Sequence, residues 1–147
     1  MFEKTIESIM NDLIQLDVDA SHAYGQAIKE IKEKDIQQQL IDFQGDHERH
    51  IKELSNLLKA LGGKPIEPTR DFKGFVIEGM TALQSLMGTK GALKAMLTNE
   101  KITNKKYADA LDHNGFTQEA RQLIQNNFND EKRHLEYIKQ KLDELEK

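Results

Sequence analysis

Apolar residues recur every three or four positions along most of this chain of 147 residues, which is the spacing of one face of an α-helix. No segment shows the sustained alternation that is typical of a β-strand. The first two apolar stripes predict helices over about residues 2–32 and 36–61. Two later stripes predict helices over about residues 89–113 and from 118 nearly to the end of the chain. We therefore expect an all-α protein with four long helices.

Local signals predict where these helices begin and end. Asp35 is followed three residues later by Gln38, which is the pattern of a capping box at a helix N-terminus. The pair Gly62–Gly63 predicts the end of the second helix, because glycine readily takes the left-handed conformation of a helix C-terminus. Thr89 and Thr117 are predicted to cap the third and fourth long helices with their hydroxyl groups.

The segment between the second and third long helices is longer than a turn between neighbouring helices needs. It covers residues 62–88, with Pro65 and Pro68 in a linker and a shorter amphipathic stripe over 72–87 that predicts an extra short helix. Ten extended residues and a sixteen-residue helix span about 33 and 24 Å, enough to return along a helix of about 39 Å. We therefore expect one domain over residues 1–147, with antiparallel helical hairpins at 2–61 and 89–146 joined by a crossover.

Composition excludes several classes of function. The net charge of −4 gives no electrostatic reason to bind nucleic acid. The chain has no cysteine, so it can form neither a disulfide nor a thiolate metal site. No apolar run approaches the roughly 20 residues that cross a bilayer, and the N-terminus lacks the apolar stretch of a signal peptide. We therefore expect a cytoplasmic protein with no membrane or nucleic-acid partner.

Polar residues inside the apolar stripes repeat in order and spacing. The first hairpin carries Asp17, Tyr24, His47 and His50, and the second carries Glu100, Tyr107, Glu131 and His134. The second set follows the first by 83 residues at the carboxylate and the tyrosine, and by 84 residues at the i, i+3 pair. A helical bundle builds a metal site in its core from a carboxylate on one helix and an i, i+3 pair on the next. This repeat predicts six metal ligands: Asp17, His47, His50, Glu100, Glu131 and His134.

A single such residue would carry little weight. Charged residues make up 31% of the chain, and one histidine on an apolar face is more often a hydrogen-bonded core residue than a ligand. The doubled pattern changes this, because a buried carboxylate costs several kcal/mol unless it is paired, protonated or bound to metal. We predict that Tyr24 and Tyr107 each donate a hydrogen bond to the carboxylate of the opposite hairpin. The neighbouring Asp–Arg pairs are predicted to be outer partners or surface ion pairs: Asp46 with Arg49, and Asp130 with Arg133.

At these residues the chain resembles the ferritin-like superfamily, in particular its rubrerythrin and bacterioferritin type. Those proteins carry a glutamate with a tyrosine seven residues later on helices one and three, and Glu-x-x-His on helices two and four. Residues 11–17, 60–65 and 72–75 also resemble a group of uncharacterised bacterial ferritin-like proteins. The resemblance covers the whole chain. It implies a ferritin-like four-helix bundle with a di-iron carboxylate centre, and an oxidase, peroxidase or ferroxidase activity in stress or metal handling.

Two of the predicted ligands depart from the family pattern. Four match it: His50, Glu100, Glu131 and His134. Asp17 replaces a glutamate, and His47 replaces the glutamate that bridges the two irons in the family. A neutral imidazole cannot bridge two cations as a carboxylate does, and only three carboxylates are left. The sequence leaves open one metal ion or an asymmetric pair bridged by Glu131, and it leaves open whether His47 is a ligand.

Two functions from different classes compete at this point. The first is a metal protein that oxidises ferrous iron or reduces dioxygen or peroxide, with iron as the expected metal and manganese or zinc as alternatives. The second is a non-catalytic bundle that serves as a stress or partner-binding module. An iron-storage cage is weaker, because the sequence shows no assembly surface. The resemblance favours a homodimer, and the sequence does not reveal the electron donor.

Overall fold

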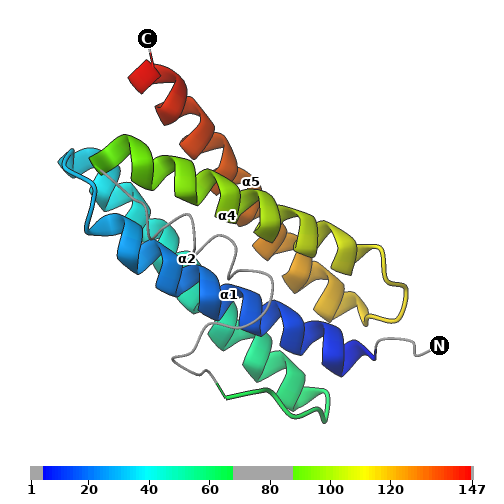
Figure 1. Ribbon diagram of the computed structural model, residues 1–147. Helices are drawn as coiled ribbons and strands as arrows, with labels where there is room; N and C mark the ends of the chain where they lie inside the picture. The colour runs from blue at the N-terminus through cyan, green and yellow to red at the C-terminus, as the bar shows by residue number, and fades with distance from the viewer. Residues whose placement is uncertain (1–4, 68–87, 147) are drawn as a thin grey trace.

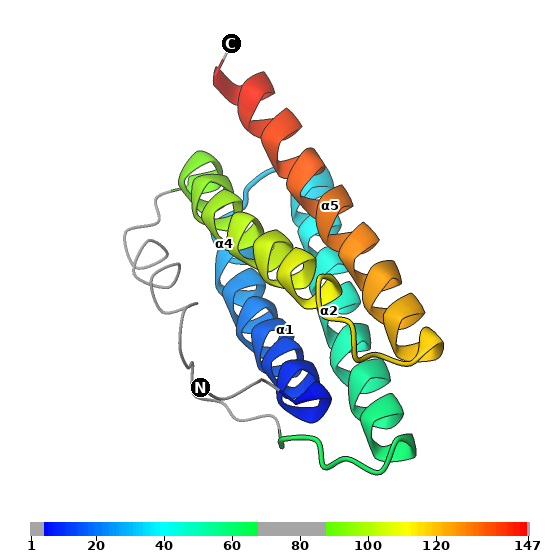
Figure 2. The ribbon, with the colours of Figure 1, turned by 90° about the vertical axis from the view of Figure 1, so that its right-hand side faces the viewer.

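The computed structural model describes residues 5–67 and 88–146, and all regular secondary structure within them is α-helical. The helices are α1 (Ile6–Ile28), α2 (Lys34–Ala60), α4 (Gly88–Leu111) and α5 (Gln118–Glu146). They pack into a four-helix bundle (Figures 1 and 2), which confirms the predicted all-α class. Among these described helices, none has both the length and the apolar character that crossing a bilayer requires.

The bundle consists of two antiparallel hairpins, α1–α2 and α4–α5 (Figure 1). Helix α1 also packs against α4, and α2 packs against α5. The chain runs along α2 and α4 in the same direction (Figure 1), so α2 ends and α4 begins at opposite ends of the bundle. The extra short helix predicted over 72–87 lies outside the described residues, which leave out residues 68–87.

Two of the predicted helix boundaries are confirmed by backbone hydrogen bonds. The Thr117 hydroxyl accepts from the Ala120 N–H group at 3.1 Å and caps α5. Gly62 has a φ of +88°, and the next N–H group, that of Gly63, donates to the Leu58 carbonyl at 2.9 Å. The left-handed glycine therefore ends α2 where the sequence predicts.

Two other predicted caps are wrong. Helix α2 begins at Lys34 with Glu33 as its N-cap, so Asp35 lies in the first turn, where its charge still favours the helix dipole. Helix α4 begins at Gly88, so Thr89 lies inside it. The Thr89 hydroxyl instead donates to Glu33 Oε1 at 2.5 Å and accepts from the Lys32 N–H group at 3.0 Å. Its contact with the α1–α2 loop is a tertiary interaction, which a local capping pattern cannot predict.

The core is divided into two apolar clusters along the bundle. One, with Met10, Leu58 and Ile124, fills the end where α1 begins. The other, with Phe43 and Met96, fills the opposite end. On α2, α4 and α5 the predicted ligands fall between the residues of these two clusters, and on α1 Asp17 lies at the inner end of the first cluster, next to Val18. The folding of the bundle therefore places the polar residues at one level inside it, with an apolar layer on each side.

Candidate metal centre

All six predicted ligands converge in the middle of the bundle and are 0% exposed. Their donor atoms form two groups, within each of which all atoms lie within 4.8 Å of one another. The first, the Asp17 group, consists of Asp17, His47, His50 and Glu131. The second, the Glu100 group, consists of His47, Glu100, Glu131 and His134. The sequence predicts the convergence, but it gives no sign that His47 and Glu131 belong to both groups.

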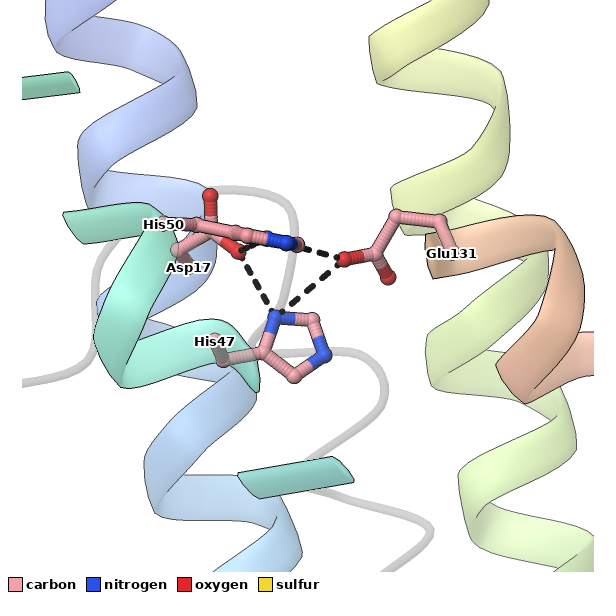
Figure 3. Close-up of side chains that lie close together, drawn as sticks. All are labelled: Asp17, His47, His50 and Glu131. Atoms are coloured by element: carbon pink, nitrogen blue, oxygen red, sulfur yellow. Dashed lines mark hydrogen bonds and ion pairs between the residues drawn. The ribbon is translucent and has the colours of Figure 1, made fainter. Parts of the chain in front are cut away.

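In the Asp17 group, hydrogen bonds connect α1 to α2. Asp17 Oδ1 lies 2.7 Å from His47 Nδ1 and 3.0 Å from His50 Nδ1. Glu131 approaches from α5, and its Oε2 atom is 3.4 Å from each of these two nitrogens. Figure 3 shows the four side chains pointing toward one another, with the two histidines between the carboxylates. Three helices thus contribute donor atoms to one point.

The Glu100 group is less well satisfied. Glu100 Oε2 lies 3.4 Å from His134 Nδ1 and 3.6 Å from His47 Nε2, and Glu131 Oε1 lies 3.6 Å from His134 Nδ1. Four buried atoms have no hydrogen-bond partner: His47 Nε2, His134 Nδ1 and both carboxylate oxygens of Glu131. Each such buried polar atom costs about 1–3 kcal/mol. A cation among these atoms would remove that cost.

Each tyrosine binds the carboxylate of the opposite hairpin. Tyr24 Oη donates to Glu100 Oε2 at 2.5 Å, and Tyr107 Oη donates to Asp17 Oδ2 at 2.5 Å. The predicted hydrogen bonds are confirmed. Burial and the nearby carboxylates raise the pKa of both tyrosines well above 10, so both keep the proton that they donate. Thr103, which the sequence analysis missed, donates to Glu100 Oε1 at 3.1 Å; its place three residues after Glu100 was the available signal.

Two aspartates hold the outer nitrogens of the histidines. His50 Nε2 lies 2.9 Å from Asp130 Oδ2, and His134 Nε2 lies 2.8 Å from Asp46 Oδ2. Each aspartate comes from the helix opposite its histidine. Each also pairs with an arginine from the histidine's own helix, since Arg49 of α2 contacts Asp130 and Arg133 of α5 contacts Asp46. This agrees with the predicted outer role. An acceptor at Nε2 fixes the ring and directs Nδ1 toward the centre, as in many metal-binding histidines.

The carboxylates keep the three histidines protonated when no cation is bound. Burial by itself lowers the pKa of an imidazole, but nearby negative charge outweighs it here. The charge of Asp17 raises the pKa of His50 to about 12. The hydrogen bond to its aspartate raises the pKa of His134 to about 11. Glu131 raises the pKa of His47 to about 9.

The pKa values of the carboxylates shift in the opposite direction, downward. Burial by itself raises their pKa, but His50 lowers the pKa of Asp17, and His134 holds the pKa of Glu100 well below its ordinary value. The three protonated histidines therefore face the ionised carboxylates of Asp17 and Glu100. A cation that enters must therefore displace protons from the histidines.

The donor set fits a divalent transition-metal ion. Imidazole nitrogens and carboxylate oxygens are the ligands that iron, manganese and zinc share in proteins. The carboxylates of Asp17, Glu100 and Glu131 are the anionic ligands, and four buried atoms around Glu100 lack a hydrogen-bond partner. The fit does not distinguish among these metals.

The fold and the centre together define a class: an all-α four-helix bundle with a buried histidine–carboxylate cluster at its middle. The family profile described as "Domain of unknown function (DUF2383)" matches residues 5–113. The chain belongs to this family. The matched stretch contains the first hairpin's ligands and Glu100, whereas Glu131 and His134 lie beyond it.

The chain is also similar to a solved structure, that of a conserved hypothetical protein from Mycobacterium tuberculosis. The two superpose with a TM-score of 0.74, over 90% of this chain and 93% of that one. Their sequences are 10% identical, so the likeness concerns the fold alone. A comparison with curated proteins finds no match.

Proposed function

We propose that this chain is a ferritin-like metal-binding protein that holds divalent cations, iron foremost, in the middle of its bundle. The observation that carries the proposal is the pair of buried four-residue groups with donor atoms that nothing else satisfies. The six proposed ligands are Asp17, His47, His50, Glu100, Glu131 and His134. Tyr24 and Tyr107 orient the carboxylates by their hydrogen bonds.

We further propose that the bound metal supports oxidation of ferrous iron or reduction of dioxygen or peroxide. Bound iron would supply the electrons for this chemistry. The chain itself excludes bulk water from the ligands, since all six are fully buried. The aspartates next to the two outer histidine nitrogens, Asp46 and Asp130, are 18% and 21% exposed. They contact the outer Nε2 atoms of His134 and His50, which keep their protons, so that Nδ1 of each ring is the atom that faces the cation.

Elemental analysis tests the metal-binding part. The chain, purified after growth with iron, manganese and zinc available, is expected to hold about one to two ions, as such bundle centres do. A ferrous oxidation assay on the same preparation then tests the activity. Rapid oxidation by the native chain, lost in a variant with His50→Ala and His134→Ala, would support it. Equal rates for both proteins would contradict it.

One observation favours the second candidate function, a non-catalytic bundle that serves as a stress or partner-binding module. In the metal-free centre the three protonated histidines already form ion pairs with Asp17 and Glu100. Such a cluster can persist as a purely structural ion-pair network. This candidate predicts a chain that folds stably without metal and tolerates alanine at the ligand positions without losing its biological role.

The homodimer suggested by the resemblance and the cytoplasmic location expected from the sequence belong to the same proposal. Sedimentation of the purified chain distinguishes a monomer, a dimer and a cage. A sedimenting species of twice the chain mass would support the dimer, and a much larger one would favour iron storage.

A further inference from the structure

His47 occupies the central position of the site, between the two ligand groups. Its Nδ1 atom faces the first group, 2.7 Å from Asp17 Oδ1. Its Nε2 atom faces the second group, 3.6 Å from Glu100 Oε2. The ring is wholly buried, so neither nitrogen can turn to solvent. One side chain therefore presents a donor atom to each group.

Glu131 has the same arrangement. Its Oε2 atom lies 3.4 Å from His50 Nδ1 in the first group, and its Oε1 atom lies 3.6 Å from His134 Nδ1 in the second. The N–C–N path through an imidazole and the O–C–O path through a carboxylate contain the same number of atoms. The two shared side chains can thus link the same pair of points.

A purely structural role for His47 and Glu131 does not explain why buried atoms of both side chains lack a hydrogen-bond partner. A hydrogen-bonded core histidine would have hydrogen-bond partners at both nitrogens. His47 is hydrogen-bonded only at Nδ1, and its Nε2 atom has only the 3.6 Å ion-pair contact with Glu100. Neither oxygen of Glu131 has a hydrogen-bond partner, although both are buried. The unpartnered atoms belong to the two residues shared by both groups, together with Nδ1 of His134.

We infer that the centre binds two metal ions and that His47 bridges them, one ion on each ring nitrogen, with Glu131 as the second bridge. This rests on the proposed metal binding. Each ion then has four donors from the chain. One has Asp17, His50 Nδ1, His47 Nδ1 and Glu131 Oε2, and the other has Glu100, His134 Nδ1, His47 Nε2 and Glu131 Oε1.

The charge of the centre agrees with this arrangement. A ring that binds a metal ion at both nitrogens carries no ring proton and is an anion, and the protons that it loses pass to solvent as the ions bind. With Asp17, Glu100 and Glu131, it provides four negative charges for two divalent ions. The buried site is then neutral, which a low-dielectric interior favours. The histidine thus supplies the charge that three carboxylates alone lack.

Copper(II) is a suitable probe, because it binds imidazole and its unpaired electron reports on a second copper nearby. The background protein carries His22→Gln and His113→Gln, which removes the only histidines outside the site as sources of adventitious binding. We expect this protein to bind two copper ions per chain. Their integrated electron paramagnetic resonance signal should fall well below the copper content, because a bridging ring couples the two spins.

His47→Gln in the same background removes the bridge and keeps a side chain of similar polarity. It should either bind one copper ion or bind two with the full signal. His47→Glu is the second variant, because a carboxylate can also bridge, and it should again bind two ions. The circular dichroism of the helices checks that both variants fold. If only one variant folds, its copper content and its resonance signal test the bridge.

The possible results distinguish a failure of the His47 bridge from a failure of metal binding itself. One copper ion per chain, or two with the full signal, would overturn the bridge and leave metal binding intact. Coupling that is unchanged in His47→Gln would assign the bridge to Glu131 alone. No stoichiometric copper at all would overturn the metal-binding proposal itself.

Discussion

The two hairpins of this bundle build the same framework around different chemistry. Around Asp17, in the first hairpin, one carboxylate oxygen is hydrogen-bonded to both histidines of α2. Around Glu100, in the second, the histidine nitrogens that face the carboxylate have no hydrogen-bond partner. The first group is thus nearly satisfied without a cation, and the second is not. We infer that the Glu100 group binds its ion more tightly than the Asp17 group does, and that it is therefore filled first.

The framework outside the ligands does not cause this difference. Each tyrosine reaches the carboxylate of the other hairpin, and each outer aspartate reaches the histidine of the facing helix. The contrast originates in Asp17 and His47, which stand at the positions that Glu100 and Glu131 occupy in the second hairpin. Substitutions at matched positions of the two hairpins therefore test whether the two groups differ in metal affinity.

The largest effect is expected at Glu131, because it belongs to both groups. Glu131→Gln removes a negative charge and replaces one of the two donor oxygens by an amide NH2 group, which cannot bind a cation. The affinity for metal should fall by more than the roughly 10–100-fold that the loss of an outer partner costs. Isothermal titration with ferrous or zinc ions measures this, with the exposed Glu136→Gln as the matched control. Affinity within a few-fold of the native value would contradict the shared role of Glu131.

A matched pair of substitutions tests which group binds first. Glu100→Gln and Asp17→Asn each remove one negative charge and preserve the shape of the side chain. We expect Glu100→Gln to weaken the tightest binding event at least about 10-fold and Asp17→Asn to weaken mainly a later one. Stepwise titration of both variants measures the difference. The reverse order would refute the comparison drawn between the two groups.

The tyrosines should give a smaller effect. Tyr24→Phe and Tyr107→Phe each remove one hydrogen bond to a ligand carboxylate without changing its charge. Metal affinity should fall by about 10-fold for an oriented ligand of this kind. Tyr24→Phe should act on the tighter event and Tyr107→Phe on the weaker one. Identical titration curves for both variants would show that the hydrogen bonds do not distinguish the groups.

The smallest effect concerns the stability of the metal-free chain as the pH changes. The pKa of His47 is about 9 in the folded state against 6.5 in the unfolded state, and the pKa values of His50 and His134 are higher still. The stabilisation of the folded chain that these raised pKa values produce is fully present below pH 6.5. It is lost as the pH rises through the pKa values of the folded state. The lowered pKa of Asp17 acts oppositely, because its contribution is present above its ordinary value of 3.8 and is lost as the pH falls.

The metal-free chain should therefore have its highest Tm between about pH 4 and 6.5. The Tm should decline by a few degrees toward pH 9, where His47 loses its proton. Thermal unfolding followed by circular dichroism in the presence of a chelator measures this. A Tm that rises steadily from pH 5 to 9 would contradict the ion-pair network. His47→Gln, which cannot titrate, should flatten the decline.

Long-range features of this protein could be predicted from its sequence because they depend on helical periodicity. The spacing of Asp17, Glu100 and the two i, i+3 pairs within apolar stripes predicts that they meet at one level, and they do. The tyrosine hydrogen bonds follow from the same spacing. What could not be predicted depends on side-chain rotation and on tertiary contacts. The opposite directions of the two nitrogens of His47, and the use of Thr89 against the α1–α2 loop, are of this kind.

The central claim, that the buried cluster binds metal, is tested most directly by elemental analysis of the purified chain beside a variant with His50→Ala and His134→Ala. A chain with His22→Ala and His113→Ala, which alters histidines outside the two ligand groups, is the control for the loss of two histidines. The native and control chains should hold stoichiometric iron, manganese or zinc, and the site variant almost none. A native chain that stays free of metal after growth with all three available would contradict the claim.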